Sequence, residues 1–97
     1  MATVHITAGL SVDGIAPVIA AVPRLKERIT SSGTSQQSAA AMRRGETCTI
    51  TVTGGNIYAQ IGPNPTASAG NDWLILDGQT RDFGFVNNGD LVAIIDA

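Results

Sequence analysis

Residues 47–61 read Thr47-Cys48-Thr49-Ile50-Thr51-Val52-Thr53-Gly54-Gly55-Asn56-Ile57-Tyr58-Ala59-Gln60-Ile61, and this stretch decides the expected fold. Apolar and polar side chains alternate on both sides of the two glycines, which is typical of β-strands with one buried face. The glycine pair suits the positive φ angles of a two-residue hairpin turn. Folding the chain there sorts every cross-strand pair by polarity. The expected pairs are Val52–Ile57, Ile50–Ala59, Cys48–Ile61, Thr51–Tyr58 and Thr49–Gln60.

A second hairpin is expected between residues 80–86 and 91–96, around the turn sequence Asn87-Asn88-Gly89-Asp90. Its first face is aromatic and aliphatic. Its second face is also largely apolar, more than a water-exposed sheet requires, so we expect something to cover it. The expected pairs are Phe85–Val92, Phe83–Ile94 and Arg81–Asp96 on one face, and Val86–Leu91, Gly84–Ala93 and Asp82–Ile95 on the other.

The first half of the chain carries weaker signals. Residues 3–8 alternate and predict a short strand that Gly9 ends. Residues 15–22 are small and apolar, but Pro17 and Pro23 favour an edge strand or an extended arm over a central strand or a helix. Residues 39–45 fit either a two-turn helix or a strand.

Residues 73–76, Trp73-Leu74-Ile75-Leu76, form an uninterrupted apolar run that follows a loop at residues 62–72. A strand without polar positions indicates burial on both faces or a contact with another subunit. The following Asp77-Gly78 pair is expected to turn the chain.

These segments predict an all-β protein: a single small β-sandwich or jelly-roll-like barrel of about eight short strands, with an extended N-terminal segment. The 97 residues suffice for one domain. Within it, we expect residues 1–27 to form an N-terminal strand or arm segment and residues 28–97 to form the β-sandwich core.

The composition suggests a surface that is largely covered by other proteins. Apolar residues make up 43% of the chain and charged residues only 14%, about half the usual charged share. Residues 1–44 hold five of the six basic residues and two acidic ones, a balance of +3, whereas residues 45–97 have a balance of −5. A basic face of one subunit meeting an acidic face of its neighbour is one interpretation, and scattered solvated charge is the other. The candidate interface residues are Arg24, Lys26, Arg28, Arg43, Arg44 and Trp73.

Catalytic, cofactor and metal sites have no support in the sequence, so we expect a protein that is not an enzyme. His5 has no Cys, Asp or Glu at a metal-ligand spacing. The aspartates at 72, 77 and 90 lie in turn sequences, where they bind the backbone. The glycines form no phosphate-binding loop, and we expect Cys48 to be buried. The acidic pI of about 5.0 argues against nucleic acid as a partner, and no apolar run suits a membrane span or a secretion signal.

The second half of the chain resembles a group of small structural proteins of tailed bacteriophages. In that group a strand leads into Gly-x-Asn-Pro-Thr-Ala, a loop, a short apolar strand, a strand with phenylalanine then valine, and a closing Gly-Asp hairpin. Residues 29–39 are similar to the Ser-Gly-Thr-Ser strand of the group. The corresponding residues here are Gly55-Asn56-Ile57-Tyr58-Ala59-Gln60-Ile61-Gly62-Pro63-Asn64-Pro65-Thr66-Ala67, Asp82-Phe83-Gly84-Phe85-Val86 and Gly89-Asp90-Leu91-Val92-Ala93-Ile94-Ile95.

The resemblance covers roughly residues 28–97 and implies a β-sandwich with a place in the virion, assembled in the host cytoplasm. It implies a capsid decoration (cement) protein, which forms a homo-oligomer, with a trimer favoured, and binds the major capsid protein. A subunit of the neck, tail or head fibre is an alternative. A recognition module, binding a host glycan or receptor through residues 62–72 with Trp73 or Tyr58 as a platform, is another.

Overall fold

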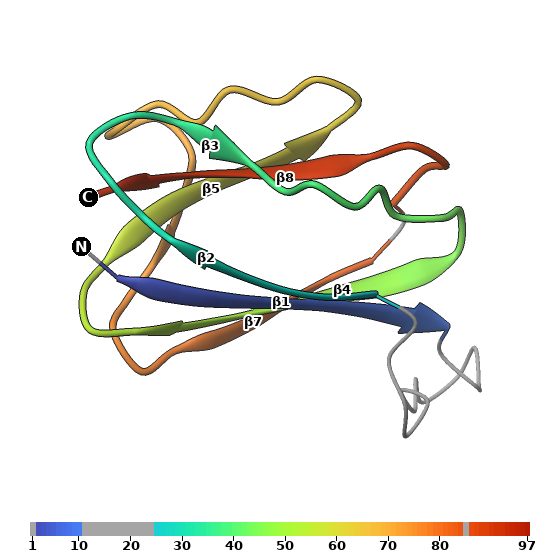
Figure 1. The fold of residues 1–97 in the computed structure, drawn as a ribbon, viewed down its shortest axis with the longest axis horizontal. Coiled ribbons are helices and arrows are strands. Elements are labelled where there is room, and N and C mark those ends of the chain that lie inside the picture. The colour runs from blue at the N-terminus through green and yellow to red at the C-terminus, as the bar shows by residue number, and fades with distance from the viewer. Residues whose placement is uncertain (1, 11–24, 85) are drawn as a thin grey trace.

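The computed structural model describes residues 2–10, 25–84 and 86–97, and within these ranges the protein is built of β-strands without a helix (Figure 1). All the strand pairs are antiparallel. The strands are β1 (Thr3–Leu10), β2 (Leu25–Thr30), β3 (Gln36–Gln37), β4 (Glu46–Thr53), β5 (Ile57–Gly62), β6 (Trp73–Ile75), β7 (Thr80–Phe83) and β8 (Leu91–Asp96).

The eight strands form two sheets of four, in the orders β2-β1-β4-β7 and β3-β8-β5-β6. Figure 1 shows the two sheets as two layers. The predicted all-β fold, a small β-sandwich of about eight short strands, is therefore confirmed. The alternation in β4 has the expected result, because its apolar side chains are buried while its threonines face outward.

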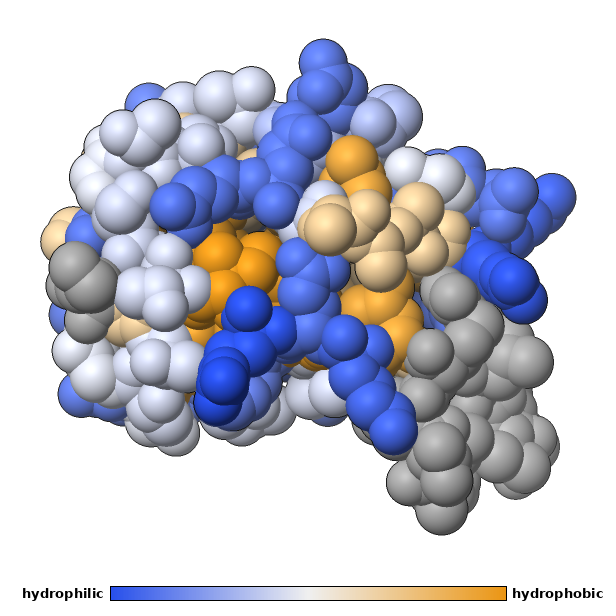
Figure 2. Space-filling view, viewed as in Figure 1, coloured by the Kyte–Doolittle hydropathy of each residue, from blue (hydrophilic) through white to orange (hydrophobic). Residues whose placement is uncertain are grey.

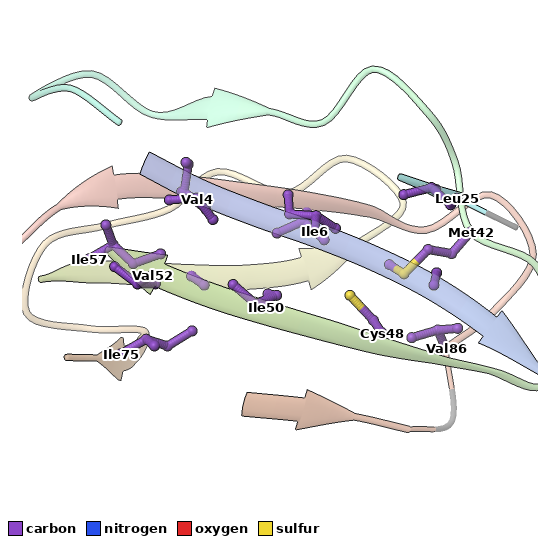
Figure 3. Packing of buried hydrophobic residues seen from close by; sticks show 14 of the residues in the cluster. Val4, Ile6, Leu25, Met42, Cys48, Ile50, Val52, Ile57, Ile75 and Val86 are labelled. Atoms are coloured by element: carbon purple, nitrogen blue, oxygen red, sulfur yellow. The ribbon is translucent and has the colours of Figure 1, made fainter. Parts of the chain in front are cut away.

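The core lies between the two layers and consists almost entirely of aliphatic side chains (Figure 3). Burying one such side chain contributes about 1.5–3 kcal/mol relative to leaving it exposed. The first sheet supplies Val4, Ile6, Leu25, Cys48, Ile50 and Val52, and the second supplies Ile57, Ala59, Ile75, Val92 and Ile94.

The hairpin predicted around Gly54-Gly55 is wrong. β4 pairs with β1 and β7, whereas β5 pairs with β8 and β6, so the chain crosses from one sheet to the other at the glycines. Of the two, only Gly54 has a positive φ, 91°. Its backbone N–H donates to the carboxylate of Asp77 over 2.9 Å, which fixes the crossing to the turn before β7. Val52 and Ile57 both belong to the core, but they lie on opposite sheets.

The second predicted hairpin, between residues 80–86 and 91–96, is also wrong. β7 adds to the edge of the first sheet, where Phe83 pairs with Cys48. β8 lies in the middle of the second sheet between β3 and β5, and Ile94 pairs with Ala59 and with Gln36. The predicted partner of Val92, residue 85, lies outside the described residues.

The N-terminal strand is confirmed, although it runs two residues past Ala8, to Leu10. It pairs with β2 on one side and β4 on the other, which places it in the middle of its sheet. The predicted edge strand or arm at residues 15–22 lies outside the described residues.

Residues 39–45 form neither the helix nor the strand that the sequence allowed. Instead, Met42 is buried and exchanges backbone hydrogen bonds with the turn before β8. Its N–H donates to the carbonyl of Asp90 over 2.8 Å, and its carbonyl accepts from Gly89 over 2.9 Å. These bonds to a distant turn replace those of a helix or a strand.

The outer face of the second sheet is partly covered by the loop at residues 63–70, as the apolar pattern of β8 required. Gln37 and Gln60 flank the buried Ala93 in the sheet. Their side chains bind the loop, since Gln37 donates to the carbonyl of Pro65 over 2.7 Å and Gln60 accepts from the N–H of Thr66 over 3.1 Å. On the face viewed in Figure 2, by contrast, hydrophilic residues surround an area of hydrophobic atoms.

Candidate interaction site

The basic residues Lys26 and Arg28 are exposed on the outer face of β2, at the edge of the first sheet. Their neighbours on β1 are Thr7 and His5, respectively. Together these side chains border an open hollow of about 450 Å³. The hollow, called the β1–β2 hollow below, is lined by His5, Ile6, Thr7, Lys26, Glu27 and Arg28.

Glu27 lines the same hollow, but its carboxylate serves the fold. It accepts backbone hydrogen bonds from Ala39, at 3.0 and 2.8 Å, and from Ala40, at 3.2 Å. By contrast, the side chains of Lys26 and Arg28 form no hydrogen bond or ion pair with another described residue. Their charges are therefore available to a partner.

The predicted basic cluster is not gathered in one place. Arg43 and Arg44 are exposed in the turn that precedes β4, and β1 separates β4 from β2. The backbone N–H of Arg43 donates to the buried side chain of Glu46 over 2.6 Å, so this turn is fixed by a capping carboxylate. Arg24 lies outside the described residues.

The middle of the first sheet presents a row of threonines to the outside. In register, Lys26 of β2 is followed by Thr7 of β1, Thr49 of β4 and Asp82 of β7. The hydroxyl of Thr49 donates to the carboxylate of Asp82 over 2.7 Å. The outer face thus runs from basic at one edge, through uncharged hydroxyls, to acidic at the other.

Trp73 is not part of the core. It is 60% exposed on β6, the edge strand of the second sheet, and the neighbouring Leu74 and Leu76 are 40% and 47% exposed. Only Ile75 is buried, so the predicted burial of this run on both faces is wrong. Asp72 and Asp77 flank the run. These five residues, Asp72, Trp73, Leu74, Leu76 and Asp77, are called the β6 strip below.

A cavity of about 430 Å³ lies beside Trp73, where the edges of the two sheets meet. Phe83 of β7 contributes to its wall. Its polar wall is held in place, because Gln60 donates to Oδ1 of Asp72 over 3.1 Å and the N–H of Ser68 donates to Oδ2 over 2.6 Å. The residues that line the cavity are Gln60, Ile61, Asn71, Asp72, Trp73 and Phe83.

No protein-family model, curated protein or solved structure matches this chain. Within residues 2–10, 25–84 and 86–97, His, Cys, Asp and Glu form no group of three that could hold a metal ion. In the same ranges, no helix is long and apolar enough to cross a membrane.

Cys48, as expected, is buried, and it is completely inaccessible. Burial raises the pKa of its thiol to about 12, and the nearby carboxylates of Asp82 and Glu46 act in the same direction. A neutral, inaccessible thiol is a poor nucleophile and a poor metal ligand. Cys48 therefore belongs to the core.

The sequence left open whether residues 73–76 are buried on both faces or form a contact with another subunit, and the exposure of Leu74 and Leu76 excludes only burial on both faces. An uninterrupted apolar run has the same pattern in a buried strand and in an edge strand that awaits a partner. The signal in the sequence that separates the two is the length of the run, since four residues between an 11-residue loop and a turn are typical of a short edge strand.

Proposed function

We propose that this protein is a structural subunit of a bacteriophage virion, and that it acts as a capsid decoration (cement) protein rather than as an enzyme. The observation that carries the proposal is the β6 strip. Exposed Trp73 and Leu74 on an edge strand, with exposed Leu76 directly after it, mark a surface that other proteins cover. The resemblance of residues 28–97 to phage structural proteins supports the same assignment.

The rest of the described surface suits a protein that works by contact. The outer face of the first sheet carries threonines between one basic and one acidic edge, which gives hydrogen-bonding groups without a large charge to desolvate. Lys26 and Arg28 lie on β2 at one edge, and Asp82 lies on β7 at the other. Such an arrangement favours oriented packing between subunits.

The proposed mechanism is the sum of many contacts. Each apolar Å² removed from water contributes roughly 25 cal/mol, less the cost of ordering the side chains and of joining two bodies. A decoration protein binds the shell in many copies, so a modest gain per subunit stabilises the whole head against the pressure of packed DNA. The major capsid protein is the proposed partner.

The test compares heads assembled with and without this protein. Heads that lack it are expected to release DNA at a lower temperature, and adding the purified protein back is expected to restore the release temperature. Equal release temperatures would contradict cementing. Cryo-electron microscopy of the same particles would show whether the protein occupies the shell or, as an alternative, the neck, tail or head fibre.

A second candidate function is supported by the cavity beside Trp73. An exposed tryptophan next to Gln60, Asn71 and Asp72 offers an aromatic face and hydrogen-bonding groups, the combination that binds the apolar and polar faces of a sugar ring. In that case the protein is a recognition module for a host glycan. A glycan array probed with the wild type and with Trp73→Ala tests this second function. Binding by the wild type that Trp73→Ala abolishes would support glycan recognition, and an array without any bound glycan would contradict it.

A further inference from the structure

The β6 strip, which is also called the knob below, is a surface with large exposed apolar side chains. Trp73, the only tryptophan of the sequence, is 60% exposed and lies on the face of β6 that pairs with Ala59. The 40% exposed Leu74 pairs with Tyr58 and lies on the other face, so the strip exposes apolar side chains on both faces of the edge strand. Tryptophan is the residue most enriched among those that dominate binding energy at interfaces. Asp72 and Asp77, at the two ends of the strip, add negative charge, and each also accepts hydrogen bonds from within the chain.

The β1–β2 hollow has the complementary properties. It has a volume of about 450 Å³, and its rim carries the exposed Lys26 and Arg28 together with His5. An indole ring attracts a cation placed over its face, and this attraction is strongest for tryptophan. The aliphatic stems of lysine and arginine also supply apolar contact.

Knob and hollow lie on opposite sides of one molecule. Phe83 of β7 lines the cavity beside Trp73, so the strip lies at the β7 edge of the first sheet. The hollow lies at the β2 edge, three strand spacings away, or about 14 Å. One molecule therefore cannot fill its own hollow.

We propose that the β6 strip of one copy of this protein docks on the β1–β2 hollow of the next copy, with Trp73 seated between Lys26 and Arg28. The inference deepens the proposed function and rests on it, because it names the contact through which the virion subunit forms its homo-oligomer.

Charge decides between this head-to-tail contact and a symmetric one. A symmetric contact through the strip places Asp72 and Asp77 against their own copies, and a symmetric contact through the hollow places Lys26 and Arg28 against theirs. Like charges brought together in this way oppose binding. The head-to-tail contact instead brings the two aspartates to a hollow with two cations and one carboxylate, that of Glu27, which is held by the backbone N–H groups of Ala39 and Ala40.

A contact between two different surfaces of the same chain has a consequence for assembly. It continues from copy to copy until the rotation closes into a ring, or it produces an open filament if the rotation does not close. A closed ring of three fits the trimer expected for a decoration protein. Each ring then buries every knob and every hollow.

Two variants of the full chain separate the two halves of the contact. Trp73→Ser removes the knob and keeps the hollow, whereas the double variant Lys26→Glu/Arg28→Glu removes the hollow and keeps the knob. All three positions are exposed, so both variants are expected to keep the β-sheet circular dichroism spectrum and the unfolding midpoint of the wild type. Leu74→Ser/Leu76→Ser serves as a second knob variant.

The masses in solution are measured by light scattering over a dilution series. The wild type is expected to form an oligomer, and each variant alone is expected to remain at the 10.0 kDa mass of one chain, with self-association at least tenfold weaker. An equimolar mixture of Trp73→Ser and the hollow variant is expected to form a dimer of twice that mass, because each contributes one intact half.

Tryptophan fluorescence then reports on the knob alone. Trp73→Ser contains no tryptophan, so titrating it into the hollow variant leaves Trp73 of the hollow variant as the only emitter. Its emission is expected to shift to shorter wavelength and to become protected from iodide quenching as the ring enters the hollow of Trp73→Ser.

A wild type that stays monomeric, a hollow variant that still self-associates, or a mixture without a mass change and a wavelength shift would overturn the inference. The failure of the proposed function is a separate result, namely heads whose DNA release does not depend on the protein. A wild-type monomer that nevertheless raises the release temperature would show that the strip docks on the capsid and not on a second copy.

Discussion

The side-chain hydroxyl of Ser31 donates a hydrogen bond to Oδ1 of Asp96, joining the residue after β2 in one sheet to the last residue of β8 in the other. The same hydroxyl accepts the backbone N–H of Ala2 over 2.8 Å. In return, the N–H of Ser31 donates to the carbonyl of Ala2, also over 2.8 Å. The two ends of the chain, which lie close together in Figure 1, are thus fastened to one buried side chain.

Ser31→Ala is expected to lower the free energy of unfolding by about 1–3 kcal/mol, because it leaves the buried N–H of Ala2 and one carboxylate oxygen of Asp96 without this partner. Urea unfolding measures the loss. Ser32→Ala is the matched control, since the hydroxyl of Ser32 makes only longer bonds, of 3.2 to 3.4 Å, to residues 34 and 36. Equal losses in the two variants would contradict the role given to Ser31.

Glu27→Ala is expected to cost about 1 kcal/mol, because the carboxylate of Glu27 accepts the backbone N–H groups of Ala39 and Ala40. These bonds attach the segment between β3 and β4 to the edge of the first sheet. Hydrogen exchange is the direct measurement, and the amides of residues 39 and 40 are expected to exchange faster in the variant. Lys26→Ala, on the opposite side of the same strand, is expected to leave both amides unchanged.

The alternation of side chains predicted which residues are buried, but it did not predict which strands pair. Val52 and Ile57 are both buried, as the pattern around Gly54-Gly55 required. Polarity sorts the pairs equally well whether two strands lie side by side or face each other across the core. Gly54 has the positive φ of a tight turn in both cases, so local sequence does not distinguish a hairpin from a crossing between sheets.

The candidate interaction site was predicted in part. Lys26, Arg28 and Trp73 are all exposed, but Lys26 and Arg28 lie on β2 whereas Trp73 lies beside Phe83 of β7. In the first sheet, β1 and β4 separate β2 from β7. That separation depends on strand order, which arises from contacts between residues far apart in sequence. The same order brings Phe83 beside Trp73, ten residues away and on the other sheet.

The buried thiol of Cys48 predicts a dependence of stability on alkaline pH. Its pKa is raised from 9.0 to about 12, first by burial and then by Asp82 and Glu46. A group whose pKa is higher in the folded state contributes its full stability below the pKa of the unfolded state and loses it as pH rises through the folded value. The loss therefore falls between pH 9 and about 12, at roughly 1.4 kcal/mol per pH unit.

Cys48→Ala separates this contribution from those of other groups that titrate at alkaline pH, because both proteins share them. The difference in unfolding free energy between wild type and variant is expected to be constant below pH 9 and to shrink as the pH is raised. Urea unfolding at a series of pH values measures the difference. Curves that stay parallel up to pH 11 would show that the thiol does not ionise differently in the folded protein.

Gly78 lies in the turn that leads from β6 to β7, and its φ of 81° is in the left-handed region. Its backbone N–H donates to the carbonyl of Val52 over 2.8 Å, so the turn is attached to β4. Gly78→Ala is expected to lower the free energy of unfolding by about 1–2 kcal/mol, because a side chain in this conformation clashes with its own backbone.

Gly62→Ala is the matched control: a Cβ at either position meets no atom within 4 Å, but Gly62 has no positive φ. Thermal unfolding of the two variants is expected to show a clear decrease in midpoint for Gly78→Ala and little change for Gly62→Ala. The reverse order would mean that the turn relaxes to accept a side chain and does not hold the start of β7.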